Sequence, residues 1–319
     1  MAVVRAALTQ TVNAFADMPD RVEDLGRLEG RLEEIRRANV DHHVELIGAA
    51  RDAGVQIICL GELFTAPYFA LNKNPMWIAM AEDAAAGPTV TELRRVAAER
   101  GIVIIAPIYE LESRTGRRFN TAVVIDADGR VLGKYRKAHI PCGANEQGEF
   151  IETFYYGRSE GPQNEPSEHI LGDNPYFPVF KTAVGNVGVS ICYDRHFEGV
   201  VAALARAGAQ IVFSPAVTFG AKSQRMWEHE FLVDACRHRV IIGGSNRKGS
   251  EKPWNQAYFG GSHFVGPDGD TLGDSSTSPE LAIADLNISA LQEPDASGWD
   301  LNRDLRPSIY SACKHIGPQ

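Results

Sequence analysis

The chain has 319 residues, which is enough for one large α/β domain or two domains of ordinary size. Its hydrophobic content of 44% and charged content of 23% are typical of a globular protein. The net charge of −9 argues against a general nucleic-acid binder and against a protein that binds anionic membrane surfaces. No apolar run approaches the ~18 residues that a membrane helix needs, and residues 1–20 lack the pattern of a signal peptide. Five cysteines without paired spacing favour a reducing, cytoplasmic environment.

Short apolar runs alternate with amphipathic helical patterns along most of the chain, which is typical of an α/β protein. In the first half, strands are expected over 3–8, 55–60, 102–108, 119–125 and 130–135, and helices over 40–53 and 89–100. In the second half, strands are expected over 187–192, 210–214, 240–245, 261–265 and 281–286, and helices over 199–207 and 223–239. Thr89 and Glu92 match the spacing of a capping box at the start of the second helix.

One short pattern occurs twice. Gly54-Val-Gln-Ile-Ile-Cys59 and Gly208-Ala-Gln-Ile-Val-Phe213 each place a glycine between an expected helix and an expected buried strand. The repetition predicts a pseudo-symmetric α/β sandwich. Residues 143–174 are polar and rich in Gly, Pro, Asn and Glu, so most of them are expected to form a surface loop near the mouth of the site. Residues 287–319 are expected to be an irregular tail that reaches a partner subunit.

Cys192 is the first candidate for catalysis. It ends the expected strand 187–192 and is followed closely by a helix, and the positive end of a helix favours the thiolate form of cysteine. The alternative is that Cys192 is a small buried apolar residue, as most free cysteines are.

Glu62 and Lys137 are the next candidates. Glu62 directly follows an expected buried strand, at the carboxyl edge of the sheet where sites of α/β proteins collect. Burial there would suit it to general acid/base catalysis, although an ordinary loop glutamate is the alternative. Lys137 lies in the basic run 134–139, which is either a solvated turn or a strand end that points Lys137 inward. A buried lysine needs an anionic partner, and Glu62 or an oxyanion would supply one.

These three segments together resemble the nitrilase superfamily. The resemblance rests on the glutamate after the first core strands, on Lys134-Tyr-Arg-Lys-Ala-His-Ile-Pro141 and on Ile191-Cys-Tyr-Asp194, in the order typical of that family, and it extends from the first strand to about residue 310. It implies a four-layer α-β-β-α sandwich, with residues 1–286 as the carbon–nitrogen hydrolase domain.

The resemblance also implies roles for individual residues. Cys192 would be the nucleophile, Glu62 the general acid/base, and Lys137 the cation that stabilises the oxyanion together with the backbone N–H of Tyr193. Residues 150–156 look like the segment that holds a second active-site glutamate in the family, which makes Glu152 the candidate to orient Lys137 and the substrate nitrogen.

Further motifs are similar to the β-ureidopropionase branch, which hydrolyses N-carbamoyl-β-alanine. They are Glu62-Leu-Phe-Thr-Ala-Pro67, Ile191-Cys-Tyr-Asp-Arg-His196, Ser214-Pro-Ala-Val-Thr-Phe-Gly-Ala221 and Ser245-Asn-Arg247. The branch implies cleavage of a carbamoyl C–N bond to give β-alanine, CO2 and ammonia, with Arg195 gripping a substrate carboxylate and His196 contacting the substrate. It requires no metal or other cofactor, and it implies a homodimer or a larger homo-oligomer.

Other functions stay open from the sequence. Hydrolases of N-carbamoyl-D-amino acids share Asp194 and Arg195, and the same glutamate, lysine and cysteine serve general aliphatic amidases and nitrilases. A catalytically silent scaffold has no need for all three residues, and a papain-like Cys-His-Asn site would need a histidine beside Cys192.

Overall fold

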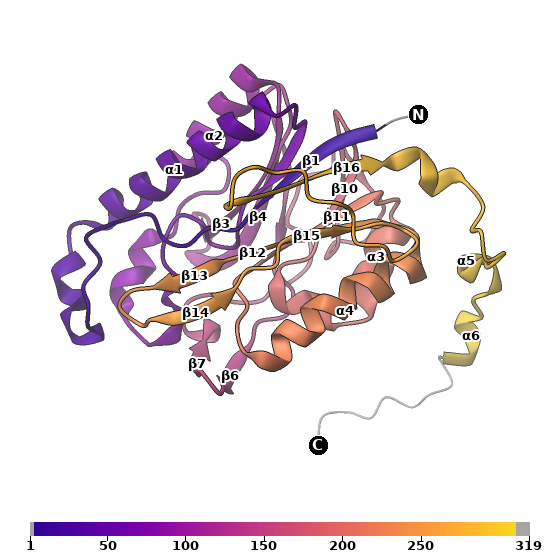
Figure 1. The fold of residues 1–319 in the computed structure, drawn as a ribbon. Coiled ribbons are helices and arrows are strands. Elements are labelled where there is room, and N and C mark those ends of the chain that lie inside the picture. Colours follow the sequence, from indigo (N-terminus) through magenta and orange to yellow (C-terminus); the bar gives the residue numbers. More distant parts are fainter. Residues whose placement is uncertain (1–2, 311–319) are drawn as a thin grey trace.

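Two six-stranded sheets lie between two pairs of helices in the computed structural model, which describes residues 3–310 (Figure 1). The first sheet has the order β16-β1-β2-β3-β4-β5, with β1 (Val3–Thr9), β2 (Ile57–Cys59), β3 (Val103–Glu112), β4 (Arg117–Ile125), β5 (Val131–Arg136) and β16 (Leu281–Asn287). The second has the order β15-β12-β11-β10-β9-β8, with β8 (Ile170–Leu171), β9 (Val179–Thr182), β10 (Gly185–Val189), β11 (Ile211–Ala216), β12 (Ile241–Asn246) and β15 (His263–Val265).

Four long helices form the outer layers. They are α1 (Leu32–Asp52) and α2 (Pro88–Arg100) on the first sheet, and α3 (Gly199–Arg206) and α4 (Ala221–His238) on the second (Figure 1). Two hairpins stand apart from the sheets, β6 (Cys142–Asn145) with β7 (Gly148–Ile151), and β13 (Lys248–Glu251) with β14 (Gln256–Phe259). Short 3₁₀ turns cover Val22–Leu28, Phe69–Leu71, Pro75–Met80, Glu152–Phe154, Cys192–His196 and Ile288–Gln292. The predicted four-layer α-β-β-α sandwich is therefore confirmed.

The two halves of the chain repeat one unit. β1-α1-β2-α2-β3 and β10-α3-β11-α4-β12 each place three parallel strands side by side, and an antiparallel strand follows in both sheets, β4 in one and β15 in the other. The glycine of the repeated sequence pattern ends the first helix of each unit. Gly54 and Gly208 have φ values of 84° and 93°, which a residue with a Cβ adopts only with strain. The repeated pattern thus marks the pseudo-symmetry that it predicted.

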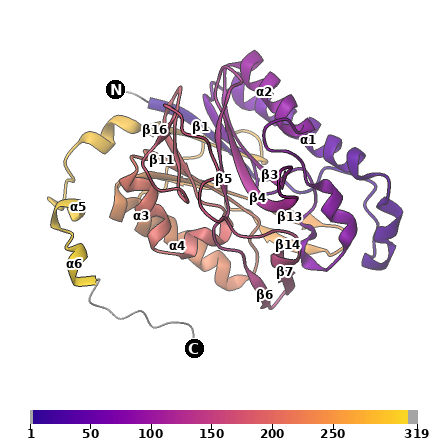
Figure 2. The same cartoon turned by 180° about the vertical axis from the view of Figure 1, so that it is seen from behind.

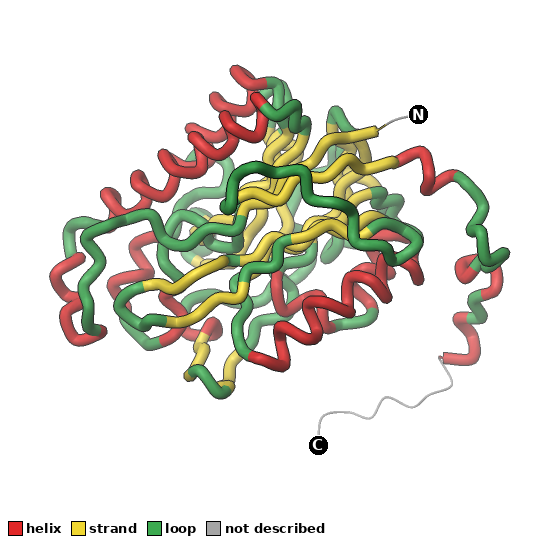
Figure 3. Tube along the Cα trace, viewed as in Figure 1, coloured by secondary structure: helices red, strands yellow, loops and turns green. Residues whose placement is uncertain are grey.

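Apolar side chains fill two layers of the sandwich. Leu8, Ile105 and Val189 belong to the layer between the sheets, while Ile58 and Leu93 belong to the layer between the first sheet and α1 and α2. Burying one such side chain stabilises the fold by roughly 1.5–3 kcal/mol. Because the central parallel strands are apolar on both faces, polar groups on them are confined to the strand ends. Figure 3 shows that these strands are followed by loops.

Two details of the first half differ from expectation. The Thr89–Glu92 capping box is wrong, because α2 begins after Gly87, and Thr89 lies inside the helix with its N–H donating to the carboxylate of Glu82 at 2.9 Å. A buried carboxylate from outside the helix therefore satisfies this end of α2. α1 also begins earlier than predicted, at Leu32. The prediction missed this start because the first residues of the helix are polar and lack a recognisable cap.

Residues 143–174 are not one loop at the site mouth. Their first part forms the β6–β7 hairpin, which Figure 2 shows together with the edge strand β5 from behind. Further along, Gln163 and Asn164 bind the backbone of β5, and Ile170–Leu171 form β8 of the second sheet. The side chain of Asn164 accepts a hydrogen bond from the Lys134 N–H at 2.8 Å and donates to the Lys134 carbonyl at 2.9 Å. An amide side chain thus replaces a neighbouring strand and covers an edge that would otherwise invite pairing with another chain.

The described part of the C-terminal tail passes the C-terminal end of α4. It holds two short helices, α5 (Leu301–Asp304) and α6 (Pro307–Tyr310), and departs from the body of the molecule in Figure 1. Within residues 3–310, none of the helices combines the length and the apolarity needed to cross a membrane.

Candidate active site

Side chains from four strand ends meet at one edge of the sandwich. Glu62 follows β2, Lys137 follows β5 and Cys192 follows β10, while Glu152 follows the β6–β7 hairpin. The Lys137 Nζ lies 2.9 Å from Oε1 of Glu62 and 2.7 Å from Oε2 of Glu152. Lys137 and Glu62 are 0% exposed and Glu152 is 1% exposed, so the lysine lies between two carboxylates without contact with solvent. The structure therefore brings these predicted site residues together.

Further groups hold the two carboxylates. Glu62 accepts hydrogen bonds from the Asn120 side chain at 2.7 Å and from the Val217 backbone N–H at 2.6 Å. Glu152 accepts one from the Tyr68 hydroxyl at 2.8 Å. Sequence analysis missed all three donors. Asn120 had one detectable signal, a polar side chain within the otherwise apolar strand β4, but a backbone N–H such as that of Val217 leaves none.

The pKa values reflect this arrangement. Burial alone would lower the pKa of Lys137, but the carboxylates of Glu152 and Glu62 outweigh burial and hold the pKa of Lys137 above its ordinary value. Burial raises the pKa of Glu152, Lys137 opposes that effect and Glu62 adds to it. The lysine therefore keeps its positive charge, which suits it to stabilise a developing negative charge.

Cys192 begins a 3₁₀ turn rather than ending the strand. Its φ of 48° is left-handed, a region that non-glycine residues seldom adopt, and it projects the sulfur at the turn between β10 and α3. The side chain is buried, and the thiol donates to the Val217 carbonyl at 3.6 Å. Val217 thus contacts Cys192 through its carbonyl and Glu62 through its N–H, which places these two side chains on either side of one peptide segment.

The expected thiolate at Cys192 is wrong for the free protein. Burial raises the pKa of the Cys192 thiol to about 12, and the Glu62 carboxylate adds to this effect, against the lowering by Lys137 and Arg195. α3 begins only at Gly199, too far along the chain for its positive end to stabilise a thiolate. The thiol is therefore protonated at neutral pH, and a nucleophilic role would require a base.

Asp194 holds the turn that carries Cys192. Its carboxylate accepts hydrogen bonds from the Ile191 N–H at 3.1 Å, from the Tyr135 hydroxyl at 2.6 Å and from the His139 N–H at 2.9 Å. Asp194 is fully buried, so these bonds link the cysteine turn firmly to β5 and to the segment after it. His139 packs here against Phe197, with ring centroids 3.7 Å apart.

Arg195 and His196 lie next to the cysteine. Arg195 is 4% exposed, and its Nη1 lies 2.7 Å from the Cys192 carbonyl oxygen and 3.8 Å from the sulfur. Its Nη2 donates to the Thr218 hydroxyl at 3.2 Å, and its Nε forms an ion pair with Glu230 at 3.2 Å. Nδ1 of His196 lies 2.6 Å from the other carboxylate oxygen of Glu230, so both residues share one acidic partner.

A small cavity of about 90 Å³ opens above the sulfur. Its walls include Tyr68, Phe150, Glu152, Cys192, Arg195 and Phe219. Since a water molecule occupies about 30 Å³ of liquid, the cavity has room for only a small molecule. In the part of the chain that the structure describes, no group of three or more His, Cys, Asp and Glu side chains is placed to hold a metal ion.

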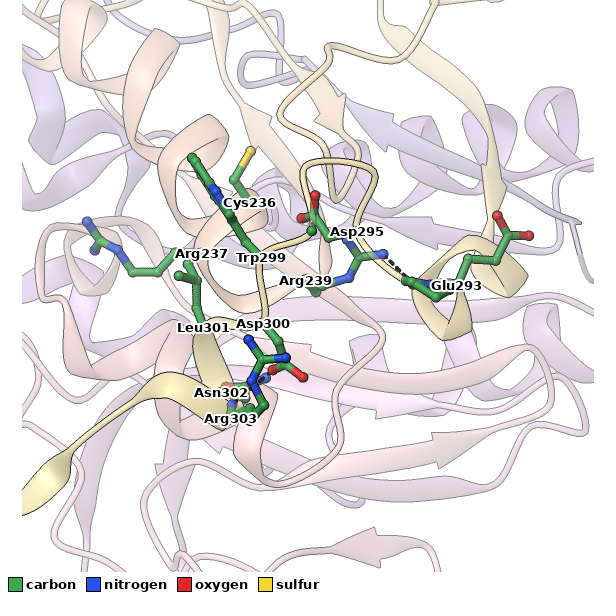
Figure 4. Close-up of a pocket in the computed structure, with 12 residues that line it drawn as sticks. Cys236, Arg237, Arg239, Glu293, Asp295, Trp299, Asp300, Leu301, Asn302 and Arg303 are labelled. Carbon is green, nitrogen blue, oxygen red and sulfur yellow. Dashed lines mark hydrogen bonds and ion pairs between the residues drawn. The ribbon is translucent and has the colours of Figure 1, made fainter.

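A larger cavity lies elsewhere, where the C-terminal tail passes α4 (Figure 4). It has a volume of about 260 Å³, and Arg239, Asp295 and Trp299 are among its walls. Arg239 is already paired with Asp295 at 3.1 Å and bonded to the Glu293 carbonyl at 2.9 Å. Because Arg239 and Asp295 pair with each other and the cavity contains none of the residues around Cys192, the candidate site is the smaller cavity.

The fold and the site together define a hydrolase of carbon–nitrogen bonds, and known proteins agree. A family model described as carbon-nitrogen hydrolase matches residues 33–294. A β-ureidopropionase from Arabidopsis thaliana is 32% identical over 86% of this chain and 66% of its own length, so about a third of that relative lies outside the match. An N-carbamoylputrescine amidase from Solanum tuberosum is 30% identical over 85% of this chain and 88% of its own. The solved carbon-nitrogen hydrolase from Helicobacter pylori G27 shares the fold, with a TM-score of 0.77 and 22% identity over 97% of both chains.

The chain belongs to the carbon-nitrogen hydrolase family of the nitrilase superfamily. It is a cysteine-dependent hydrolase that acts on non-peptide carbon–nitrogen bonds. The resemblance derived from three short motifs is thereby confirmed.

The raised pKa of Cys192 leads to a prediction about stability. Between its ordinary value of 9.0 and about 12, the unfolded thiol ionises while the folded thiol keeps its proton. The folded protein then binds more protons, so its stability should fall as the pH rises, by up to about 1.4 kcal/mol per pH unit. Cys192→Ser removes this titration. Urea unfolding at neutral pH and at about pH 10 should show a smaller loss in the variant than in the wild type; parallel losses would contradict the raised pKa.

Proposed function

We propose that this site hydrolyses the carbamoyl C–N bond of a ureido acid, with N-carbamoyl-β-alanine as the substrate and β-alanine, CO2 and ammonia as the products. One observation carries the proposal. The buried Lys137 between Glu62 and Glu152 lies beside the Cys192 thiol, and an arginine lines the same cavity. Lys137, its two carboxylates and the Cys192 thiol are the groups needed to transfer an acyl group to sulfur. The arginine is suited to bind the carboxylate of an acid.

The first step is attack of the Cys192 sulfur on the carbamoyl carbon. The thiol is protonated, so Glu62 takes its proton as the new C–S bond forms. Lys137 and the Tyr193 N–H face the negative charge on the carbonyl oxygen, since the first N–H groups of a helical turn have no partner inside that turn. Removing one such donor commonly costs about 3 kcal/mol of transition-state stabilisation.

Collapse of the tetrahedral intermediate breaks the C–N bond, and Glu62 returns the proton to the leaving nitrogen. Glu62 then takes a proton from water, whose oxygen attacks the carbonyl carbon. The C–S bond breaks, and Glu62 returns that proton to the sulfur, which restores the thiol and the carboxylate. The overall reaction gives the same products whichever nitrogen leaves first. If ammonia leaves first, water releases a carbamate that decomposes to CO2 and β-alanine. If β-alanine leaves first, water releases carbamic acid, which gives CO2 and ammonia. Glu152 orients Lys137 and the substrate nitrogen.

The carboxylate of the substrate is assigned to Arg195. A guanidinium has five N–H groups. Nη1 faces both the carbonyl oxygen and the sulfur of Cys192, Nη2 donates to Thr218, and Nε lies beside Glu230, which leaves one N–H of Nη2 without an assigned partner. A substrate carboxylate would accept from this N–H and, in place of the sulfur, from Nη1, because two parallel donors match the two oxygens of a carboxylate. Glu230 also neutralises the arginine in the free protein, so the substrate meets a charge that is already held in place.

Substitution of the nucleophile tests the reaction class. Cys192→Ala should abolish ammonia release from N-carbamoyl-β-alanine and leave the fold intact, because the side chain is small and its thiol is not part of the core ion network. Cys59→Ala is the matched control, a buried cysteine on β2 without contact with the site. Turnover by Cys192→Ala, or loss of turnover only in the control, would exclude Cys192 as the nucleophile.

Substitution of Arg195 tests the substrate. A charge-assisted hydrogen bond contributes roughly 1.5–3 kcal/mol, so Arg195→Ala should lower kcat/KM for N-carbamoyl-β-alanine about ten- to a hundred-fold, largely through KM. Its neutral amide and N-carbamoylputrescine should lose little. Glu230→Gln is the control, since it breaks the ion pair and keeps the arginine.

Two results would contradict binding of the substrate carboxylate by Arg195. Equal turnover of all three compounds by the wild type would favour a general amidase or nitrilase. Faster turnover of N-carbamoylputrescine would favour the activity of the similar N-carbamoylputrescine amidases. Preference for N-carbamoyl-D-alanine over N-carbamoyl-β-alanine would assign the site to α-carbamoyl amino acids.

We also propose a homodimer or larger homo-oligomer in which residues 1–286 form the hydrolase domain and the tail from residue 287 reaches the partner. The outer face of α4 exposes Met226, Leu232 and Val233, and the tail exposes Trp299 and Leu301. Apolar side chains gathered in this way favour contact with another protein surface. Light scattering should give the mass of at least a dimer, and we expect α3 and α4 to contribute to its interface. A stable and active monomer would contradict the proposal.

A further inference from the structure

A further buried ion pair, formed by Arg247 and Glu251, contacts the segment that carries Glu62. Arg247 directly follows β12 and Glu251 ends β13, and the two side chains contact each other with 4% and 2% exposure. Neither lines the cavity above Cys192. Arg247 belongs to one of the motifs singled out in the sequence, but the reaction described above does not use it.

The two side chains form hydrogen bonds with the backbone of the segment from Glu62 to Tyr68 at both of its ends. Nη2 of Arg247 lies 3.2 Å from the Glu62 carbonyl oxygen, 2.9 Å from that of Leu63 and 2.9 Å from that of Ala66. Glu251 accepts the Tyr68 N–H at 2.8 Å. This segment lies in neither a long helix nor a strand, and Leu63 has a left-handed φ of 50°. Its backbone groups therefore depend on side chains for their hydrogen bonds.

The same segment supplies two groups of the site. The Glu62 carboxylate at its start contacts Lys137, and the Tyr68 hydroxyl at its end donates to Glu152. A buried ion pair is weak evidence for stability, because desolvation of two charges offsets their attraction. Here both partners direct further hydrogen bonds at the backbone of one segment, and that segment carries Glu62.

We propose that Arg247 and Glu251 are positioning residues that fix the backbone of residues 62–68, and so set the place of the Glu62 carboxylate relative to Cys192 and Lys137. The proposal rests on the proposed function, in which Glu62 moves the proton. A displacement of about 1 Å in a reacting group can lower a rate a hundred-fold. Loss of the pair should therefore lower kcat about 10- to 100-fold and change KM by less than about threefold, because neither residue touches the substrate.

The test uses Arg247→Met combined with Glu251→Gln, which leaves no unpaired buried charge. The readouts are kcat, KM and the pH profile of kcat/KM for the best substrate of the panel above, together with the melting temperature. Arg36→Met is the matched control, since Arg36 is also buried, donates to the Met80 carbonyl at 2.9 Å and pairs with Glu33, but does not contact residues 62–68. A fall in kcat with a displaced pH profile, absent from the control at equal folded fraction, is expected.

Arg247→Lys carries the test if the double variant does not fold. It keeps the charge beside Glu251, but its single nitrogen cannot pair with Glu251 and reach the three carbonyl oxygens at once, as the two terminal nitrogens of Arg247 do, so kcat should fall by an intermediate factor at a similar melting temperature. The proposal is overturned if kcat of the folded variants stays within about threefold of the wild type, or if Arg36→Met lowers kcat equally. Glu62→Gln distinguishes a failure of the proposed function from a failure of the positioning role. An active Glu62→Gln variant refutes the proposed function itself, whereas an inactive one beside fully active Arg247 variants refutes only the positioning role.

Discussion

The buried contact of Lys137 with Glu62 and Glu152 is the constraint on which the rest of the site depends. One positive and two negative charges lie together without solvent, an arrangement that is tolerable only if each group is fully hydrogen-bonded. Asn120, the Val217 N–H and the Tyr68 hydroxyl complete that bonding. Because these groups come from distant parts of the chain, both sheets must close before the ions can be buried.

The same cluster explains why Cys192, the proposed nucleophile, rests as a thiol. Burial and the neighbouring carboxylate keep the proton on Cys192, although Lys137 and Arg195 oppose them. A protonated thiol next to a carboxylate that is held by Val217 is ready for coupled attack and proton transfer, without exposing a thiolate to solvent. Lys137 balances two carboxylates in the free protein, and in the proposed reaction it would also balance the oxyanion.

The repeated pattern at Gly54 and Gly208 predicted the pseudo-symmetry, because a glycine between a helix and a strand is a local signal. The four-layer sandwich and the meeting of Glu62, Lys137 and Cys192 were predicted through the resemblance of three short motifs to the nitrilase superfamily. The left-handed backbone at Cys192 was not, since a residue at the end of an apolar run looks like part of its strand. Val217 acts through its backbone, which has no side-chain signature, and Asn164 imitates a strand from within a polar stretch. Arg195 could be placed near the site by spacing, but its partner Glu230 lies on α4 and only the folded chain brings them together.

The most direct measurement is mass spectrometry of protein quenched with acid while it turns over N-carbamoyl-β-alanine. The account predicts an acyl adduct on Cys192 that disappears once the substrate is consumed, and its mass identifies the nitrogen that leaves first. An adduct that retains the β-alanine part means that ammonia departs in the first step. An adduct on any other residue, such as the exposed Cys142, would contradict the account.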